Sequence, residues 1–432
     1  MRGIVQLVCC VCFVACAPSR DAGPDTLVDP ARVDDVLAGY VERGELVGVS
    51  ALVYEDGEEA YFGAFGLADR RTGRPMARDT LARIFSMTKP VTGVTLMTFY
   101  DEGRFGLDDP LYEYLPEYRD VQVYVSGDGD AAVLEPPRRP ILVRDILRHT
   151  AGFASGGEDH YAGRRMRDAR ADAPENTLAE LSMRLATVPL ADQPGTRWWY
   201  GPSVDVQARL VEVLAGKPYI EVLETRVLQP LAMRDTVYLL RADQEGRLMD
   251  LHQRLPDGSF VRAMDPGLAD FNSAEWPLTP GGWGLVSTLD DYLRFARMLL
   301  QAGELDGVRI LAPGTVALMT TDALPATVQD RGWLPNKGQV GFGIDFAVRV
   351  APPANDAEAS GAVGEFFWDG LANTLFWVDP ENDIAAVLFN QYLPWGQTEI
   401  MKDFRDAVYY RDPVASALVK PAAAPDAPRL SH

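Results

Sequence analysis

Apolar residues recur with helical spacing through the middle of the chain and form short strand-like runs near both ends. The spacing of Val33, Leu37 and Tyr40 predicts a helix over residues 29–46, and a second helix is predicted at 399–410. Two apolar runs separated by Asp56-Gly57 are typical of a β-hairpin. The predicted strands are 46–54, 58–67, 339–350, 365–368, 371–378 and 384–391.

Helical patterns dominate residues 107 to about 330, between loops rich in Gly, Pro and Asp. The predicted helices there are 143–149, 176–187, 204–214, 219–229 and 289–302. Strands at both ends with helices between them predict an α+β fold, in which one sheet is assembled from both termini and a helical subdomain is inserted. We expect this domain to span residues 31–412 and to be followed by a Pro/Ala-rich tail, 413–432.

Ser86 and Lys89 stand three residues apart at the predicted start of a further helix. Pro90 is tolerated only near the beginning of a helix, which places that beginning close to Ser86. Residues i and i+3 lie on one helical face, so the hydroxyl and the amine can meet. An amine that accepts the serine proton, or that holds a neighbouring base deprotonated, activates serine without histidine.

This Ser-x-x-Lys pair is unusual for the chain, which has 13 Ser and only 5 Lys. Random placement gives about 0.15 such pairs. Where charge alone is needed, this chain uses Arg, which cannot lose its proton at working pH. The motif alone leaves two interpretations open: an activated nucleophile, or a capping Ser beside a solvated Lys.

A base for the serine has to come from elsewhere, and Tyr200 is the best candidate because it stands at a loop-to-helix junction. Its phenol needs a nearby cation such as Lys89 to ionise at neutral pH; the alternative is packing with Trp198 and Trp199. His149 precedes Ala151-Gly152 and is interpreted as a helix C-cap. The sequence has no G-x-S-x-G elbow, no phosphate-binding loop and no metal-ligand spacing, so we expect neither metal nor cofactor.

The net charge of -21 argues against a nucleic-acid partner. Arg2 and the apolar run 4–15 are typical of a secretory signal peptide, predicted as residues 1–15 with a tether at 16–30. Phe13-Val14-Ala15-Cys16 resembles a bacterial lipobox, which implies lipidation of Cys16 and attachment to the cell envelope, facing the periplasm or the exterior. Ordinary cleavage near Ala15 or Ala17 would instead give a soluble secreted protein.

Taken together, five segments resemble the serine β-lactamase and penicillin-binding-protein superfamily, in particular the class C-like branch that includes family VIII carboxylesterases. The resemblance covers residues from about 33 to 410 and implies a β-lactamase/transpeptidase-like fold with an antiparallel sheet. The segments are Phe85–Pro90, Leu147–Phe153, Tyr200-Gly201-Pro202, Gly281–Thr288 and Trp368-Asp369-Gly370.

The resemblance implies roles for single residues. Ser86 is the implied nucleophile, with Lys89 and Tyr200 as its partners, and the backbone N–H groups of Ser86 and Leu371 form the implied oxyanion hole. The implied substrate-binding residues are Trp368, Asp369, Gly370 and Pro202. Trp368 and Pro202 stand where β-lactamases place a cation and an amide, which disfavours β-lactams and favours a neutral, partly apolar acyl group. Asp369 either repels anionic substrates or turns outward.

These observations favour a serine hydrolase that acts through an acyl-serine intermediate on a small ester or amide, most of all an esterase on small neutral esters. The alternatives are a β-lactamase or a D,D-peptidase. An alternative of another class is a non-catalytic cell-wall binding protein, against which an intact Ser86, Lys89 and Tyr200 set argues.

Overall fold

The computed structural model describes residues 26–155, 157, 159–263 and 266–410. The predicted signal peptide, Cys16 and the predicted tail lie outside the described residues. Within the part of the chain that is described, no helix is both long and apolar enough to cross a membrane.

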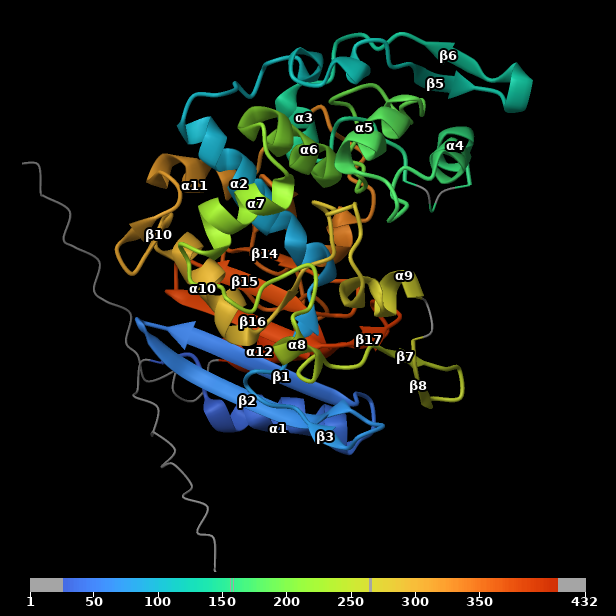
Figure 1. The fold of residues 1–432 in the computed structure, drawn as a ribbon. Helices are drawn as coiled ribbons and strands as arrows, with labels where there is room; N and C mark the ends of the chain where they lie inside the picture. Colours follow the sequence, from blue (N-terminus) through green and yellow to red (C-terminus); the bar gives the residue numbers. More distant parts are fainter. Residues whose placement is uncertain (1–25, 156, 158, 264–265, 411–432) are drawn as a thin grey trace, which may run out of the picture.

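An eight-stranded sheet forms the base of the molecule (Figure 1). Every neighbouring pair in it is antiparallel. In spatial order its strands are β12 (Val340–Phe342), β13 (Ala347–Arg349), β14 (Phe366–Asp369), β15 (Leu375–Asp379), β16 (Ile384–Asn390), β1 (Gly48–Glu55), β2 (Glu58–Asp69) and β3 (Arg74–Pro75). The two termini meet at the β1–β16 pair, where Leu52 faces Val387. The prediction of one sheet built from both ends is therefore confirmed.

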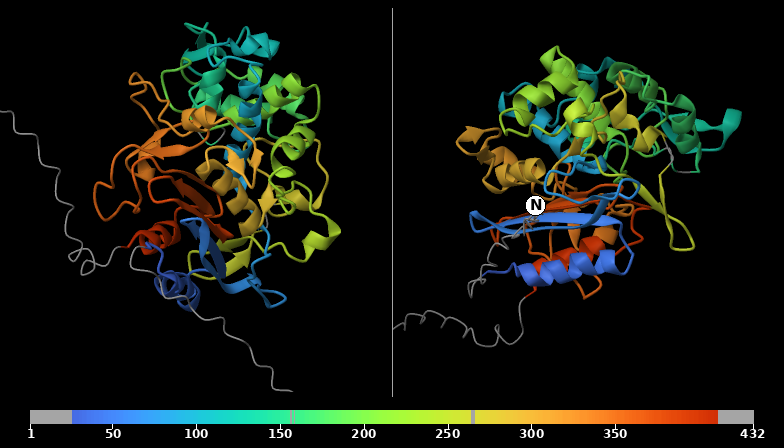
Figure 2. Two further views of the ribbon diagram at one scale, coloured as in Figure 1. Left: turned by 90° about the vertical axis from the view of Figure 1, so that its left-hand side faces the viewer. Right: turned by 60° about the horizontal axis from the view of Figure 1, so that its bottom comes forward.

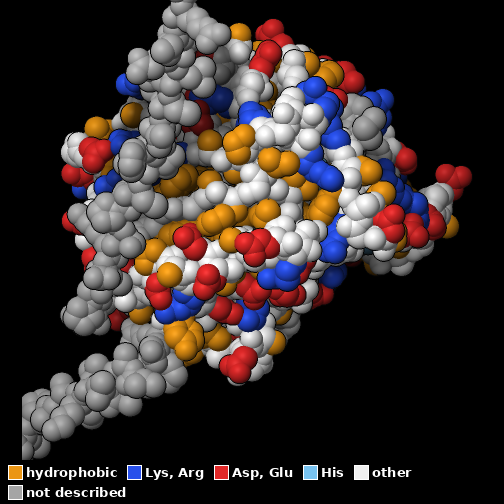
Figure 3. Space-filling view, turned by 90° about the horizontal axis from the view of Figure 1, so that it is seen from below, with side chains coloured by type: hydrophobic (Ala, Val, Ile, Leu, Met, Phe, Trp, Pro, Cys, Tyr) orange, Lys and Arg blue, Asp and Glu red, His pale blue; other side chains and the backbone are white. Residues whose placement is uncertain are grey.

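Helices cover both faces of the sheet (Figure 2). The N-terminal α1 (Pro30–Glu42) and the C-terminal α12 (Ile400–Tyr409) pack together on one face, and α10 (Leu289–Leu300) packs on the other. All eight residues of β1 are buried because both of its faces are covered. Acidic and basic side chains are interspersed on the surface seen from below (Figure 3).

The remaining helices lie between β3 and β12 in the sequence. They are α2 (Thr88–Asp101), α3 (Val143–Leu147), α4 (Tyr161–Ala169), α5 (Leu178–Ala186), α6 (Ser203–Ala215), α7 (Tyr219–Leu223), α8 (Ala242–Glu245), α9 (Pro266–Ala269) and α11 (Pro313–Met319). Most of them form the upper part of the molecule, whereas α8 and α9 lie lower, at the level of the sheet (Figure 1). The short strands are β4 (Ala82–Arg83), β5 (Val123–Ser126), β6 (Val133–Glu135), β7 (His252–Arg254), β8 (Phe260–Arg262), β9 (Val286–Ser287), β10 (Glu304–Leu305), β11 (Val308–Arg309) and β17 (Tyr392–Leu393).

The long helix α2 runs through the centre of the fold, and its residues are buried from Thr88 to Phe99. Two of its threonines satisfy their hydroxyls inside the helix: Thr95 Oγ1 donates to the carbonyl of Val91 at 2.8 Å, and Thr98 Oγ1 donates to the carbonyl of Thr95 at 2.8 Å. Such a helix shows no polar face in the sequence. The burial of α2 gives Ser86, which directly precedes it, a rigid support.

Two predicted strands are wrong in detail. The strand predicted at 371–378 begins only at Leu375, because residues 371–373 form a turn in which the Asn373 N–H donates to the carbonyl of Gly370 at 2.9 Å. Residues 339–350 form a hairpin of β12 and β13 instead of a single strand. The chain reverses between Gly343 and Phe346, where Asp345 adopts a left-handed φ of 59°. Apolar residues continue through this turn, so the hydrophobic pattern carries no signal for it.

Candidate active site

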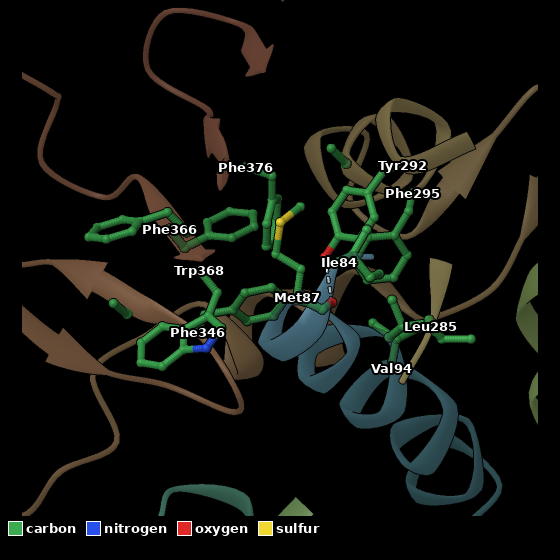
Figure 4. Packing of buried hydrophobic residues seen from close by; sticks show 14 of the residues in the cluster. Ile84, Met87, Val94, Leu285, Tyr292, Phe295, Phe346, Phe366, Trp368 and Phe376 are labelled. Carbon is green, nitrogen blue, oxygen red and sulfur yellow. Dashed lines mark hydrogen bonds between the residues drawn. The ribbon is translucent and has the colours of Figure 1, made fainter. Parts of the chain in front are cut away.

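Ser86 lies in the short 3-10 helix Phe85–Met87, which leads directly into α2. The residue before it, Phe85, has a left-handed φ of 45°, an unfavourable conformation for an aromatic residue. The surrounding packing holds this bend: Ile84 N–H donates to the carbonyl of Leu285 at 3.0 Å, and Tyr292 Oη donates to the carbonyl of Met87 at 2.7 Å. Figure 4 shows Ile84 and Met87 anchored among buried aromatic side chains. Ser86 therefore sits on a fixed turn.

The amine of Lys89 meets the hydroxyl of Ser86. Its Nζ lies 3.3 Å from Ser86 Oγ and 2.7 Å from the carbonyl oxygen of Gly282, and the residue is buried. The i, i+3 spacing thus brings the two groups together. Ser86 and the Gly282 carbonyl together orient the amine.

The glycine-rich segment 281–288 passes close to this pair. A Cβ at Gly281 would overlap the backbone carbonyl of Val204, so only glycine allows the approach. The carbonyl of Gly281 also accepts a hydrogen bond from Thr92 Oγ1 on α2 at 2.7 Å. The segment supplies backbone oxygens to the site.

Tyr200 lies just before α6 and reaches the same site. Lys89 Nζ lies 4.6 Å from the centroid of its ring, so the amine contacts the face of the aromatic system. The Tyr200 hydroxyl accepts a hydrogen bond from Trp368 Nε1 at 3.3 Å. Among the described residues, Lys89 makes no hydrogen bond to the phenol oxygen itself.

Aromatic rings surround Tyr200 and form one side of the site, which we call the aromatic wall. The centroid of the Tyr200 ring lies 5.0 to 5.9 Å from the centroids of four other rings. The aromatic wall consists of His149, Trp198, Tyr200, Trp333 and Trp368. Trp199, by contrast, turns away and donates through its indole N–H to Asp192.

The predicted capping role of His149 is carried by its backbone: His149 follows α3 with a left-handed φ of 58°, and the Thr150 N–H donates to the carbonyl of Asp145 at 2.8 Å. The His149 ring is completely buried in the aromatic wall, and neither ring nitrogen has a hydrogen-bond partner among the described residues. Burial, followed by the charge of Lys89, lowers the pKa of His149 well below its usual value. The ring is therefore neutral and packs as an apolar group.

The segment Trp368-Asp369-Gly370, at the end of β14, lies beside the turn of Ser86. A Cβ at Gly370 would stand 2.5 Å from the carbonyl oxygen of Ile84, so this close approach requires glycine. In the turn that follows, the N–H of Leu371 has no acceptor among the described residues. It is thus available to a ligand near the turn of Ser86.

Asp369 does not face solvent as an unpaired charge. It forms an ion pair with Lys337, whose Nζ lies 4.7 Å from the ring centroid of Trp368. The rings of Trp333 and Trp395 also contact this amine. Asp369 therefore neither turns outward nor presents an uncompensated charge that would repel anionic substrates, because Lys337 compensates its charge. Pro202 stands at the start of α6 and is half-buried.

Two buried carboxyl groups near Lys89 were not anticipated. Asp205 Oδ1 accepts from the Gly282 N–H at 3.0 Å, and burial raises its pKa to about 6, opposed by the charge of Lys89. Asp345 accepts from Gln207 at 3.1 Å, and burial raises its pKa as well, again opposed by Lys89. The only available signal was an acid within an apolar run, such as Val204-Asp205-Val206.

The whole arrangement can be compared with known proteins. Residues 33–410 match the family model described as Beta-lactamase. The chain belongs to the β-lactamase family. Among β-lactamase-family relatives, Protein Rv1367c of Mycobacterium tuberculosis is 36% identical over 361 residues, which cover 82% of this chain and 88% of that protein. Esterase EstB of Burkholderia gladioli is 29% identical over 405 residues, which cover 88% of this chain and 95% of that protein.

Solved structures of the β-lactamase family show the same fold. EstCE1, described as a hydrolase with promiscuous acyltransferase activity, superposes with a TM-score of 0.71 at 25% identity and covers 88% of this chain and 98% of its own. Simvastatin synthase (LovD) from Aspergillus terreus superposes with a TM-score of 0.76 at 23% identity; the match covers 88% of this chain and 98% of that one. The resemblance drawn from the five motifs is confirmed, and with it the β-lactamase/transpeptidase-like fold.

No group of three or more His, Cys, Asp or Glu side chains that could hold a metal ion occurs within residues 26–155, 157, 159–263 and 266–410. The chemistry that the described side chains offer at this β-lactamase-family site is therefore that of a hydroxyl, an amine and a phenol, next to a free backbone N–H.

Proposed function

We propose that this protein is an esterase that cleaves small carboxylic esters through an acyl-serine intermediate. The observation that carries the proposal is the 3.3 Å contact between Lys89 Nζ and Ser86 Oγ at the start of α2. A buried amine against a hydroxyl is an arrangement that activates serine in the absence of a usable histidine. The neutral, unpartnered His149 cannot serve as the base because it does not reach Ser86 through any hydrogen bond.

In the proposed reaction, Ser86 Oγ attacks the ester carbonyl carbon while its proton passes to the Lys89–Tyr200 pair. The N–H groups of Ser86 and Leu371 stabilise the oxyanion of the tetrahedral intermediate. The proton then goes to the departing alcohol oxygen as the ester bond breaks. Water attacks the acyl-serine in the second half of the reaction and releases the acid, which regenerates the Ser86 hydroxyl.

The part of the ester that lies against Trp368 and Pro202 is neutral and apolar. Trp368 offers one indole N–H, which Tyr200 already accepts, and Pro202 has no donor. The nearby cation Lys337 is compensated by Asp369. A carboxylate placed there would lose its hydration without gaining a charge-assisted hydrogen bond. This favours esters over penicillins and cephalosporins.

The test compares kcat/KM for p-nitrophenyl butyrate with kcat/KM for nitrocefin on one preparation. We expect the ester to be favoured by about 10- to 150-fold, the value of one charge-assisted hydrogen bond. A ratio below one would refute the esterase assignment and favour the β-lactamase alternative. Release of D-alanine from a D-Ala-D-Ala peptide would favour a D,D-peptidase.

Acyl transfer is a second candidate activity, because an alcohol can replace water in the second step. It is supported by the relative called acyltransferase CalJ of Penicillium decumbens, which is 25% identical over 405 residues. Addition of n-butanol should then give butyl butyrate from p-nitrophenyl butyrate, measured by gas chromatography. Release of butyric acid alone at all butanol concentrations would contradict it.

We also propose that Cys16 carries the lipid that attaches the protein to the cell envelope. The support is the lipobox-like sequence at residues 13–16 and the preceding apolar run. Cys16→Ser should shift the protein from the membrane fraction to the soluble fraction. Wild-type protein that incorporates no labelled palmitate would point to the soluble secreted form.

A further inference from the structure

A cavity of about 680 Å³ opens between α4 and α9. These two helices lie on the same edge of the molecule (Figure 1). Met166 and Arg167 line the cavity from α4, and Leu268 lines it from α9. Its lining shares no residue with the aromatic wall. The cavity is large enough for a substantial part of a small ester.

The cavity borders the segments that carry the proposed nucleophile. Trp283, which also lines it, directly follows Gly282, the residue whose carbonyl accepts from Lys89. Leu268 packs against a small buried cluster that contains Phe85, the neighbour of Ser86, and Ala372, the neighbour of Leu371. A substrate bound at Ser86 can therefore extend into this space.

The rim of the cavity carries two arginines and one carboxylate, in a protein whose net charge is -21. Arg167 extends from α4 and Arg170 follows that helix; Asp172 is the carboxylate. Among the described residues, the carboxylate nearest to Arg170 is that of Glu175, which at 3.9 Å is too far for a hydrogen bond. The guanidinium of Arg170 can therefore donate to a ligand in the cavity.

A third arginine lies behind the cavity wall. Arg83 is 5% exposed and donates to the carbonyls of Met249 and Ala269, while its Nε has no partner among the described residues. No carboxylate of the described residues forms an ion pair with it. Burial lowers the pKa of Arg83 to about 10, so it is still charged at neutral pH. Buried charges are normally paired, but Arg83 is compensated only by the carboxylates of Asp250 and Asp270 beyond ion-pair distance, so it favours a further anion nearby.

A second, water-sized cavity of about 10 Å³ lies between Arg83 and the residues that line the larger one. Arg83 and Phe85 line it, and it shares Leu268 and Trp283 with the larger cavity. The wall between the buried cation and the larger cavity is therefore one layer of side chains thick.

We infer that the cavity between α4 and α9 binds an anionic group, a carboxylate, on the part of the ester that is remote from Trp368, with Arg167 and Arg170 as its ligands. This inference rests on the proposed esterase function. The substrate is then an ester with two unlike parts: a neutral, apolar part against the aromatic wall and a carboxylate in the cavity.

The experiment uses matched pairs of esters that differ in one carboxylate. On the acyl side, the mono-p-nitrophenyl ester of glutaric acid is compared with its methyl ester. On the alcohol side, 4-carboxyphenyl butyrate is compared with its methyl ester. The enzymes are the wild type, Arg167→Gln, Arg170→Gln and the double variant. Arg165→Gln on the same helix is the control, because Arg165 pairs with Asp168 and does not line the cavity.

In at least one pair, the wild type should favour the anionic ester in kcat/KM, mainly through a lower KM. The double variant should lose this preference by about three- to tenfold, a value reduced because both arginines are partly exposed. Turnover of the methyl esters should stay unchanged, and Arg165→Gln should behave as the wild type. An anionic-to-neutral ratio that is unaffected in the double variant for both pairs, or that falls equally in Arg165→Gln, would overturn the inference.

Binding separates this inference from the proposed function. In isothermal titration calorimetry, the Ser86→Ala variant should bind one of the anionic esters more tightly than its methyl ester, and adding both arginine substitutions should remove the difference. Equal binding of both members of each pair overturns the carboxylate site even if the enzyme hydrolyses esters. Selective binding without any wild-type turnover would keep the site and refute the esterase.

Discussion

Asp205→Asn isolates the charge of a buried carboxyl group at the centre of the site. Asparagine has nearly the same size, and its Oδ1 can still accept the hydrogen bond from the Gly282 N–H, which is 3.0 Å long in the wild type. The substitution therefore removes the ionisation and little else. Burial raises the pKa of Asp205 to about 6 in the folded state, from an ordinary value of 3.8.

The sign of the effect on stability follows from this direction. Between the two pKa values the folded state binds more protons than the unfolded state, so the free energy of unfolding falls as the pH rises. A difference of roughly two pKa units corresponds to about 3 kcal/mol over the whole transition, of which about 1.4 kcal/mol falls between pH 5 and pH 7.5. The free energy of unfolding of Asp205→Asn should not fall in this way as the pH rises. Relative to the wild type, this variant should gain that amount of stability over the same interval.

Urea unfolding at pH 5.0 and 7.5, followed by tryptophan fluorescence, measures the difference. The same ionisation should give an acid limb near pH 6 in kcat/KM, since the Asp205 carboxylate interacts with Lys89. Asp291→Asn is the control: burial also raises the pKa of Asp291 to about 6, but this residue lies on α10 and bonds to Asp235 N–H. Asp291→Asn should gain stability relative to the wild type between pH 5.0 and 7.5, as Asp205→Asn does. Its kcat/KM should still fall below about pH 6, whereas Asp205→Asn should lose this dependence. A stability difference between Asp205→Asn and wild type that does not change with pH would refute the reasoning.

Three further substitutions test single contacts. Lys89→Arg should reduce kcat/KM for p-nitrophenyl butyrate nearly as much as Lys89→Ala, because a guanidinium cannot accept a proton; a largely retained rate would leave Lys89 an electrostatic role only. Trp368→Phe removes the indole N–H, 3.3 Å from Tyr200 Oη, but keeps a ring; kcat should fall about three- to tenfold with an unchanged melting temperature, and an unchanged kcat would count against this hydrogen bond. Gly370→Ala places a Cβ 2.5 Å from the carbonyl oxygen of Ile84 and should shift the adjacent backbone N–H, which lowers kcat by about 10²-fold in ester assays; wild-type kcat would contradict the proposed oxyanion hole.

The sequence predicted the sheet well because its strands are bounded by turn residues. The Asp56-Gly57 turn joins β1 and β2, and both residues adopt positive φ values, of 49° and 85°. The β12–β13 hairpin was predicted as a single strand because its turn contains the buried Asp345 within an apolar run. Helix α4 was not predicted from the sequence, since its residues include three arginines and a glycine and form no continuous apolar stripe.

The candidate site divides in the same way. Ser86 and Lys89 were predictable because their spacing along one helix fixes their separation. Asp205, by contrast, approaches Lys89 only through the packing of α6 against α2. A buried acid on a helix has the same local sequence as a solvated one, so burial and pKa come only from the tertiary structure. The pairing of Asp369 with Lys337, 32 residues away, was inaccessible for the same reason.

The nucleophilicity of Ser86 is the central claim, and mass spectrometry after reaction with a fluorophosphonate tests it most directly. The wild-type protein should gain one adduct, and tryptic peptides should place it on Ser86. Folded Ser86→Ala protein should gain none, while Ser203→Ala, at the start of the neighbouring helix α6, should react as the wild type does. An adduct on another residue, or a wild-type protein that stays unlabelled and hydrolyses no ester, would contradict the account and favour a non-catalytic binding protein.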